Sequence, residues 1–404
     1  MNRLLLIKIG KAWQTLRREG VVRGMKRIVP AGLALFGHVR PADVLFVTGG
    51  VGDSARYRTR HVGEGLLRNG ISSSVTVQDN PLLASYADKF SVFVLHRVLF
   101  TPSVAKLVGR VKAQGKAIVF DTDDLVFDPK YLEHMDYWRV MNALERKLYE
   151  HGVGGEILAD PYVTVATAST SFIADKLREY GKTVYVVPNR LPDSDLEVIG
   201  TLLPERRARI GAARKTDTVT LSYFSGSLGH DKDFATVTEP LLSLLSRYPQ
   251  LRLLLVGPLS IDPRFDAFSD RIERMHYVPR EKHFGNIARS DIVIAPLEIG
   301  NPFCEGKSEL KFFEAGALEV PIVAAATRPF REAITDGTDG FVASTAGEWE
   351  AKLESLIVDP ELRKRIGERA RETALSKYVT RAADDAVYVS YLRESIDRVR
   401  KMSS

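Results

Sequence analysis

Short apolar runs alternate with longer amphipathic stretches along most of the chain, from Asp43 onward. The short runs have the length and composition of buried strands, whereas the stretches between them repeat their apolar positions every three or four residues, as helices do. Strands separated by helices predict parallel sheets with right-handed crossovers. In the first half, the expected strands are Val44–Thr48, Ser74–Val77, Val92–Leu95, Ala117–Asp121, Tyr162–Ala166 and Thr183–Val187.

The alternation pauses after Val187-Pro188-Asn189 and then begins again. The expected strands of the second half are Val219–Phe224, Leu251–Val256, Met275–Val278, Ile292–Ala295, Ile322–Ala325 and Gly340–Val342. This repetition predicts an α/β protein with two Rossmann-like, doubly wound domains facing a cleft. In such sheets, ligands bind beyond the carboxyl ends of the strands. The loops that follow the strands are therefore where chemistry is expected.

The chain length of 404 residues also favours two domains over one. The predicted boundaries are a basic amphipathic segment at 1–40, a first domain at 41–195, an Arg- and Glu-rich linker at 196–216, a second domain at 217–378, and a C-terminal helix at 379–404 that returns to the first domain. The single cysteine, Cys304, excludes an intramolecular disulfide and is typical of a reducing compartment such as the cytoplasm. The sequence has no apolar run long enough to span a membrane.

Positive charge gathers at the start of the chain. The first forty residues carry nine Lys and Arg against one acid, Glu19, although the whole chain has a net charge of only +6. Lys8 and Lys11 interrupt the apolar stretch too early for a signal peptide. Two uses fit residues 1–38: contact with an anionic surface at the inner face of the cytoplasmic membrane, or packing on the protein or a partner. A nucleic-acid partner is not expected, because this arm lacks interleaved aromatic residues and a known binding module.

The segment from Ala295 to Pro321 holds the most specific chemistry. A strand is expected to end at Ala295, and a helix to begin near Ser308, whose side chain would cap free amides that attract anions. Lys307, Lys311 and Glu314 would share one face of this largely apolar helix. Buried charge is costly unless it meets a partner or a ligand. A simple Lys311–Glu314 ion pair is the alternative, but the flanking loop favours a ligand site.

The run Glu314-Ala-Gly-Ala-Leu-Glu-Val-Pro321 resembles the Glu-Ala-x-Ala-x-x-x-Pro-like element of family-4 retaining glycosyltransferases, which have the GT-B fold. The resemblance implies that Lys307, Ser308 and Lys311 bind the donor diphosphate and that Glu314 binds the ribose hydroxyls. In that family another Glu stands eight residues before the last one, close to the sugar. Here that position is Gly306, and the nearest acid, Glu305, is displaced by one residue and becomes the candidate.

Two further loops of the second half fit this resemblance. In Ser225-Gly226-Ser227, the glycine allows backbone to approach a phosphate or sugar closely, although ordinary strand–helix turns have the same composition. The loop occupies the place of the family's donor loop, so Gly226 and Ser227 are substrate-binding candidates. The resemblance also implies that backbone groups at Val278 bind the nucleobase.

In the first half, Thr48-Gly-Gly-Val-Gly-Asp-Ser-Ala-Arg-Tyr-Arg58 follows the first strand and is not a dinucleotide fingerprint. It resembles the flexible glycine loop and Ser-x-Arg-Tyr-Arg run of related glycosyltransferases. Gly50 would then line the substrate site, and Arg56 and Arg58 would meet the diphosphate or an anionic acceptor. The alternative is that both arginines are exposed at the start of a helix.

Charged residues also follow the third and fourth strands. The resemblance makes His96 the residue that contacts the donor sugar or the acceptor. Asp121, Asp123 and Asp124 could together hold Mg²⁺ or Mn²⁺. The resemblance, however, implies an enzyme that balances phosphate charge with basic residues and helix dipoles. We therefore expect Asp123 and Asp124 to bind the acceptor, with no metal and no cofactor.

With these residues, the family resemblance implies a hexosyltransferase-type glycosyltransferase that moves a sugar, with retention, from a nucleotide sugar to a glycan or lipid-linked acceptor in bacterial surface polysaccharide synthesis. Lys307, Lys311 and His96 are the catalytic candidates. No nucleophile–base pair is apparent in the sequence, in keeping with a transfer in which the departing phosphate assists deprotonation of the acceptor. The alternatives are a nucleotide-sugar epimerase of the same fold and a non-catalytic scaffold.

Overall fold

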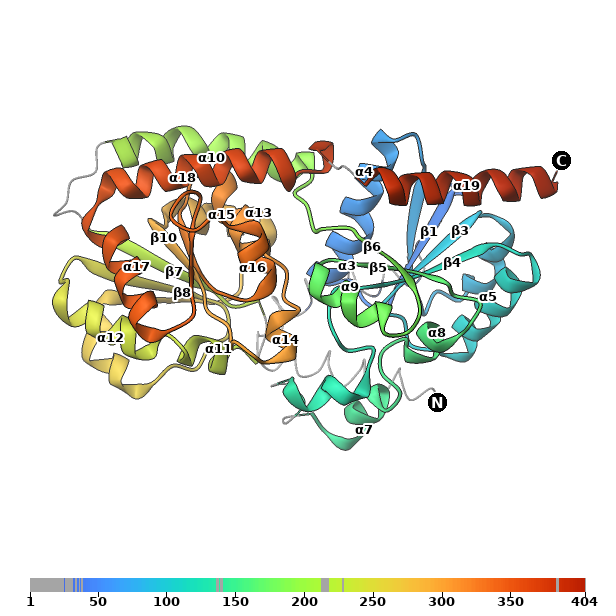
Figure 1. Ribbon diagram of the computed structural model, residues 1–404, viewed down its shortest axis with the longest axis horizontal. Coiled ribbons are helices and arrows are strands. Elements are labelled where there is room, and N and C mark those ends of the chain that lie inside the picture. Colours follow the sequence, from blue (N-terminus) through green and yellow to red (C-terminus); the bar gives the residue numbers. More distant parts are fainter. Residues whose placement is uncertain are drawn as a thin grey trace. The chain divides into compact units, whose positions relative to one another are not determined.

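A computed structural model of the chain forms two α/β units, each built around its own parallel sheet (Figure 1). Unit 2 runs from Asn189 to Ala383 and includes His134–Tyr137, and unit 1 comprises the rest of the chain. The structure describes residues 25, 32, 35, 37, 39–135, 138, 141–211, 218–226, 229–382 and 385–403. Nearly all of the expected basic segment at 1–40 therefore lies outside the described residues. No helix of the described part is long and apolar enough to cross a membrane.

Unit 1 contains a six-stranded sheet in the order β2-β1-β3-β4-β5-β6. All neighbouring strands are parallel, and β1 and β3 lie side by side at the point where the winding reverses. The strands are β1 Val44–Thr48, β2 Ser73–Val77, β3 Val92–His96, β4 Ala117–Thr122, β5 Val165–Ala168 and β6 Thr183–Val186. The helices include α3 Asp53–Ala55, α4 Val62–Arg68, α5 Pro102–Ala113, α7 Ala143–Arg146, α8 Gly155–Ala159, α9 Ser171–Arg178 and α19 Ala386–Ser403.

Unit 2 repeats this architecture with the order β12-β11-β10-β7-β8-β9. The strands are β7 Val219–Phe224, β8 Leu251–Val256, β9 Ile272–Met275, β10 Ile292–Ala295, β11 Ile322–Ala325 and β12 Phe341–Ala343. The helices include α10 Asp193–Gly211, α11 Asp231–Ala235, α12 Thr238–Arg247, α13 Arg280–Arg289, α14 Pro302–Glu305, α15 Leu310–Ala317, α16 Arg328–Ala333, α17 Ala346–Val358 and α18 Pro360–Lys377. The prediction of two doubly wound parallel sheets is confirmed.

Several strands have the bounds that the sequence predicts. β1, β10 and β11 are buried at every residue and have the expected bounds. β9 differs, because it ends at Met275, where the sequence predicted a start. β9 is the edge strand, and its Ile-Glu-Arg-Met sequence is half polar, so the neighbouring Tyr277-Val278 was the stronger apolar signal.

The stretch expected as a linker, 196–216, is helical as far as it is described, because α10 continues through it to Gly211. The side chain of Arg206 explains this difference from the prediction. Arg206 is 3% exposed, and its guanidinium donates to the carbonyl oxygens of Ala288 and Glu319, 3.0 Å away in each case. A sequence rich in Arg and Glu therefore forms a packed helix, because backbone carbonyls of unit 2 satisfy its buried charge.

The last helix, α19, packs on the sheet of unit 1. Tyr388, Leu392 and Ile396 belong to one buried cluster with residues of β1 and β3, including Val44 and Val94. The C-terminal helix is thus part of the core of unit 1, although it follows the whole of unit 2 in the sequence.

Candidate functional site

The segment after β10 folds as two short helices, α14 and α15, joined by a loop that leads into the first turn of α15. We call residues 306–311 the lysine loop. The expected cap at Ser308 is wrong, because α15 begins at Leu310 with Glu309 as its N-cap. The Ser308 hydroxyl instead accepts a hydrogen bond from Asn189 Nδ2 at 3.1 Å. Among the described residues, no side chain caps the first turn of α15, so its leading amides keep their attraction for an anion.

Two lysines stand at this uncapped turn. Lys311 lies within the first turn of α15, with its Nζ 5.8 Å from the centre of the Tyr223 ring, and Lys307 precedes the helix. Burial, together with the nearby charge of Lys307, lowers the pKa of Lys311, although Asp233 and Glu314 act in the opposite direction. Neither ammonium group forms a hydrogen bond or an ion pair within the described part of the chain. The lysine loop therefore carries two ammonium groups without an ion-pair partner there, and Asp233 and Glu314 act on Lys311 without a direct contact.

Glu314 has partners that the sequence did not indicate. It is buried, and its carboxylate accepts hydrogen bonds from Arg280 Nη1 at 2.7 Å and from His283 Nε2 at 3.1 Å. Arg280 also donates from Nε to Asp195 at 2.9 Å. The simple Lys311–Glu314 ion pair considered from the sequence is thus wrong, since Glu314 pairs with α13. The only feature of the sequence that could have indicated this pairing is that Arg280 and His283 stand three residues apart on one helix.

A second hydrogen-bonded group lies within electrostatic reach of the same lysines. Asp233 is buried and accepts from His230 Nδ1 at 3.0 Å and from Cys304 Sγ at 3.2 Å. Burial alone would raise the pKa of Asp233, but the contacts with His230 and Cys304 and the charge of Lys307 leave it lowered. Burial and the Asp233 charge raise the pKa of the Cys304 thiol.

Asp233, Glu298 and Cys304 bring ligand atoms within 4.8 Å of one another, a spacing that a metal ion could use. However, the protonated thiol donates to Asp233, and the positive charge of Lys307 acts on both residues. A cation would have to displace this hydrogen bond beside a like charge. These three residues therefore fit a hydrogen-bonded cluster better than a metal site.

The remaining candidates of unit 2 occupy loops or short turns. The Glu305 carboxylate accepts from the backbone N–H groups of Gly300 at 3.2 Å and Arg328 at 3.1 Å, so it holds the start of α16. Its contact with a sugar stays a prediction. Gly226 is exposed, and among the described residues a Cβ there would meet nothing within 4 Å. Val278 lies in the loop between β9 and α13, and Ser227 lies outside the described residues.

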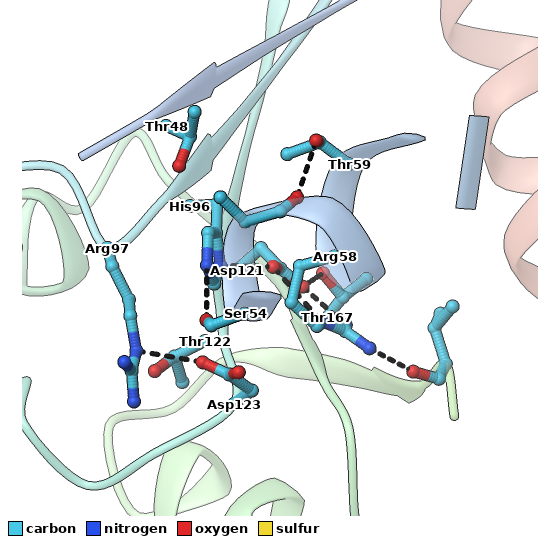
Figure 2. Close-up of polar contacts among 12 residues, drawn as sticks. Thr48, Ser54, Arg58, Thr59, His96, Arg97, Asp121, Thr122, Asp123 and Thr167 are labelled. Atoms are coloured by element: carbon cyan, nitrogen blue, oxygen red, sulfur yellow. Dashed lines mark hydrogen bonds and ion pairs between the residues drawn. The ribbon is translucent and has the colours of Figure 1, made fainter. Parts of the chain in front are cut away.

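Unit 1 holds a polar network of its own at the carboxyl ends of β3 and β4 (Figure 2). At its centre is Asp121, which is buried. Its carboxylate accepts from Arg58 Nη2 at 2.5 Å, from His96 Nδ1 at 2.8 Å and from Thr167 Oγ1 at 2.6 Å. Burial alone would raise the pKa of Asp121, but Arg58 and His96 outweigh it and hold the pKa well below its ordinary range.

Arg58 reaches Asp121 from a stretch of π-helix, Arg56–His61, that lies between α3 and α4. Such wide turns occur often at functional sites. Arg58 is 1% exposed and also donates to the carbonyl oxygen of Val187. The sequence suggested an exposed arginine or a phosphate ligand, whereas this side chain is buried and holds the central carboxylate. Arg56 is half-buried and pairs with Asp53 at 3.0 Å, and Gly50 lies exposed in the preceding loop.

His96 links the centre of the network to Ser54. Its Nδ1 contacts Asp121 and its Nε2 lies 3.0 Å from Ser54 Oγ, which gives a hydroxyl–imidazole–carboxylate chain (Figure 2). The sequence showed no such pair, whereas the structure brings a hydroxyl within hydrogen-bond distance of the imidazole. Ser54 is 42 residues and Asp121 is 25 residues from His96 in the sequence, so no local motif could indicate this contact.

The two other acids that follow β4, Asp123 and Asp124, share one cationic partner, Arg97. Arg97 contacts Asp123 through Nε and Asp124 through Nη2, both at 2.8 Å. Arg97 adopts a left-handed backbone with φ of 47°, and its carbonyl oxygen lies so close to Gly49 that a Cβ there would be 2.0 Å away. Gly49 is thus required by the close approach of two backbone segments. Binding of an acceptor by Asp123 and Asp124 stays a prediction.

Comparison with known proteins assigns a class to this architecture. Residues 236–384 match the family described as Glycosyl transferase-like. The structure superposes on Anabaena HepE in complex with UDP with a TM-score of 0.58 and 13% identity over 86% of this chain and 99% of that one. It also matches sucrose-phosphate synthase from Thermosynechococcus elongatus with a TM-score of 0.58 and 14% identity over 88% and 99% of the two chains. The chain has the GT-B fold.

Two relatives point to the same class. The chain is 24% identical over 194 residues to the putative glycosyltransferase EpsD of Bacillus subtilis (strain 168), a match that covers 47% of this chain and 50% of EpsD. It is 23% identical over 215 residues to the alpha-D-kanosaminyltransferase of Streptomyces kanamyceticus, covering 50% and 52%. The matches span about half the length of these relatives. Like the family match, they show that part of this chain is similar in sequence to glycosyltransferases.

Proposed function

We propose that the protein is a glycosyltransferase whose nucleotide-sugar donor binds through its diphosphate to Lys307, Ser308 and Lys311. The observation that carries the proposal is the pair of lysines that have no ion-pair partner in the described part of the chain and stand at the uncapped first turn of α15. A diphosphate would neutralise both lysines and accept from the first-turn amides. The Ser308 hydroxyl accepts from Asn189, so its own proton remains available for a phosphate oxygen.

The same groups suit the chemistry of the transfer. Sugar transfer passes through an oxocarbenium-like state while negative charge grows on the departing diphosphate. Fixed cations and helix amides stabilise that charge without reorganising. Glu314 is held by Arg280 and His283, and by the family-4 resemblance we assign the ribose hydroxyls to its carboxylate. We assign the nucleobase to the backbone at Val278 and, by the family-4 resemblance, propose transfer with retention.

We further propose a glycan or lipid-linked acceptor in bacterial surface polysaccharide synthesis, with residues 1–38 as the contact to an anionic membrane surface. The basic, amphipathic sequence of that segment supports the assignment. Co-sedimentation with vesicles of phosphatidylglycerol should fall when residues 1–38 are removed, and sedimentation with neutral vesicles should not change. Equal sedimentation of both proteins would reject membrane contact through this segment.

The substitution Lys311→Ala tests the donor site. We expect turnover to fall by about 10²-fold, the usual effect of losing one group that stabilises the transition state. A matched control is Lys364→Ala, because Lys364 lies exposed on α18. Donor hydrolysis and transfer would be measured over a set of nucleotide sugars, together with calorimetry of the nucleoside diphosphates.

Each outcome of these measurements has a distinct meaning. Unchanged turnover of Lys311→Ala at saturating donor would remove the lysine loop from the mechanism. Failure of every nucleoside diphosphate to bind would reject a transferase and favour a scaffold. Formation of an epimerised sugar, as opposed to the simple hydrolysis product of the donor, in the absence of any acceptor would indicate an epimerase.

A further inference from the structure

The imidazole of His230 has no role in donor binding as proposed above. It lies in the loop between β7 and α11, which follows the carboxyl end of a central strand of the unit 2 sheet. Ligands bind at that edge of parallel sheets. The Nδ1 atom of His230 contacts Asp233 Oδ2 at 3.0 Å, and the side chain is 17% exposed. His230 is therefore held from one side and remains accessible to solvent.

A short series of hydrogen bonds connects His230 to the lysine loop. Asp233 is 4% exposed, and its other oxygen, Oδ1, accepts from Cys304 Sγ and from the backbone N–H of Glu298, each at 3.2 Å. The carbonyl oxygen of Cys304 in turn accepts from the backbone N–H of Lys307 at 3.1 Å. All of these residues belong to unit 2, so the contacts fix the loop of His230 relative to the lysine loop within one unit.

Asp233 determines which ring nitrogen of His230 carries the proton. Burial raises the pKa of Asp233, but its contacts with His230 and Cys304 leave the pKa lowered, so the carboxylate is ionised near neutral pH. An ionised carboxylate has no proton to donate, and His230 Nδ1 must therefore supply the proton of their hydrogen bond. In the neutral imidazole, Nε2 then has a lone pair and cannot donate to a phosphate oxygen. Contact of Nε2 with a phosphate thus requires the imidazolium, in which both nitrogens donate.

The charges that act on His230 favour the neutral imidazole until an anion binds. Burial lowers the pKa of His230, and the charges of Lys307 and Lys311 act in the same direction, whereas Asp233 opposes them. Without a ligand, His230 is therefore neutral near neutral pH. A diphosphate on the two lysines would offset their charges and add negative charge of its own, which favours the imidazolium.

We propose that His230 is a third basic group of the donor site, which takes up a proton from solvent at Nε2 as the diphosphate binds and then donates a hydrogen bond to a phosphate oxygen. This inference rests on the proposed donor site at the lysine loop. His230 is a substrate-binding residue in this arrangement, and Asp233 is a positioning residue that acts through it. The imidazolium adds to the fixed positive charge that faces the departing diphosphate. It takes no proton from the acceptor, so the departing phosphate keeps that role.

His230→Asn tests the proposal, because an Asn side chain can keep a donor to Asp233 but has no counterpart of Nε2. Calorimetry of ADP, GDP, UDP and dTDP in PIPES and Tris buffers, which differ in ionisation enthalpy, gives both the affinity and the proton uptake. We expect the variant to bind about 10-fold or more weakly than the wild type and to take up fewer protons near neutral pH. Burial raises the pKa of Glu309 in the lysine loop to about 7, so Glu309 can add to the uptake of both proteins, and only their difference reports on His230. His151→Gln, at an exposed histidine of unit 1, is the matched control.

A measurement on the wild-type protein separates contact with the ligand from a structural role. The pKa of His230, followed by NMR through the ring signals that His230→Asn lacks, should rise when the nucleotide binds. An unchanged pKa, or equal affinity and proton uptake in the wild type and the variant, would overturn the role of His230 while donor binding at the lysine loop stands. Failure of the wild type to bind any of the four nucleotides would overturn both proposals.

Discussion

Glu309 offers a quantitative test of how unit 2 is held together. Its side chain is 7% exposed at the N-cap of α15, and it accepts a hydrogen bond from the Tyr378 hydroxyl. Burial raises the pKa of Glu309 to about 7, against the partial compensation of its own backbone amide, Tyr378 and Arg190. Tyr378 in turn stacks on Phe313 of α15 with ring centres 4.9 Å apart. The lysine loop thus contains a glutamate whose folded environment favours the neutral form.

The magnitude follows from the linkage between proton binding and folding. The pKa of Glu309 is about 7 in the folded protein and 4.5 as its ordinary value. Between these two values the folded state holds the proton more tightly than the unfolded state. The contribution of Glu309 to stability is therefore fully present below about pH 4.5 and is lost as the pH rises through 7. At about 1.4 kcal/mol for each pKa unit, the loss reaches about 3 kcal/mol.

Glu309→Gln removes the titration and keeps the size of the side chain. We expect the variant to match the wild type near pH 4.5 and to exceed its free energy of unfolding by up to about 3 kcal/mol at about pH 8. Denaturant unfolding followed by the fluorescence of Trp349, which is buried in α17, reports on unit 2 when Trp13 and Trp138 are replaced by Phe. Glu361→Gln at an exposed position of α18 serves as the control. A pH-independent difference for Glu309→Gln, or a wild type more stable than the variant at alkaline pH, would contradict the linkage.

Two further substitutions test other contacts by unfolding measurements. Arg280→Ala leaves the buried carboxylates of Asp195 and Glu314 without their shared cation, so it should cost about 3 kcal/mol or more. Adding Asp195→Asn should recover part of this loss, and full stability of the single variant would contradict the pairing. Gly49→Ala places a Cβ 2.0 Å from a backbone carbonyl oxygen and should cost at least about 1–3 kcal/mol. Gly226→Ala meets nothing within 4 Å among the described residues and should leave the melting temperature unchanged; equal effects of the two glycine variants would be inconsistent with the close approach at Gly49.

Burial does not by itself decide how well the sequence predicts the bounds of a strand, because β5, β10 and β11 are all buried at every residue and only β10 and β11 have the expected bounds. β10 and β11 are apolar runs buried at every residue, and both have the expected bounds. β5 begins at Val165 instead of Tyr162, which lies outside the ladder and donates its hydroxyl to the carbonyl oxygen of Lys116 at 2.8 Å. Hydropathy records that a residue is apolar, but it does not distinguish a strand residue from one that packs beside the strand.

The spacing of apolar residues along the chain was enough to predict the two parallel sheets and to place the polar candidates at the ends of strands. His96 and Asp121, for example, stand opposite each other in the register of β3 and β4. The partners of these polar side chains could not be read in the same way: Ser54 meets His96, and Arg280 meets Glu314, only in the folded chain. Helices and strands depend on neighbours in the sequence, which the sequence displays directly. Hydrogen bonds between residues tens of positions apart depend on distances of about 3 Å that packing alone sets.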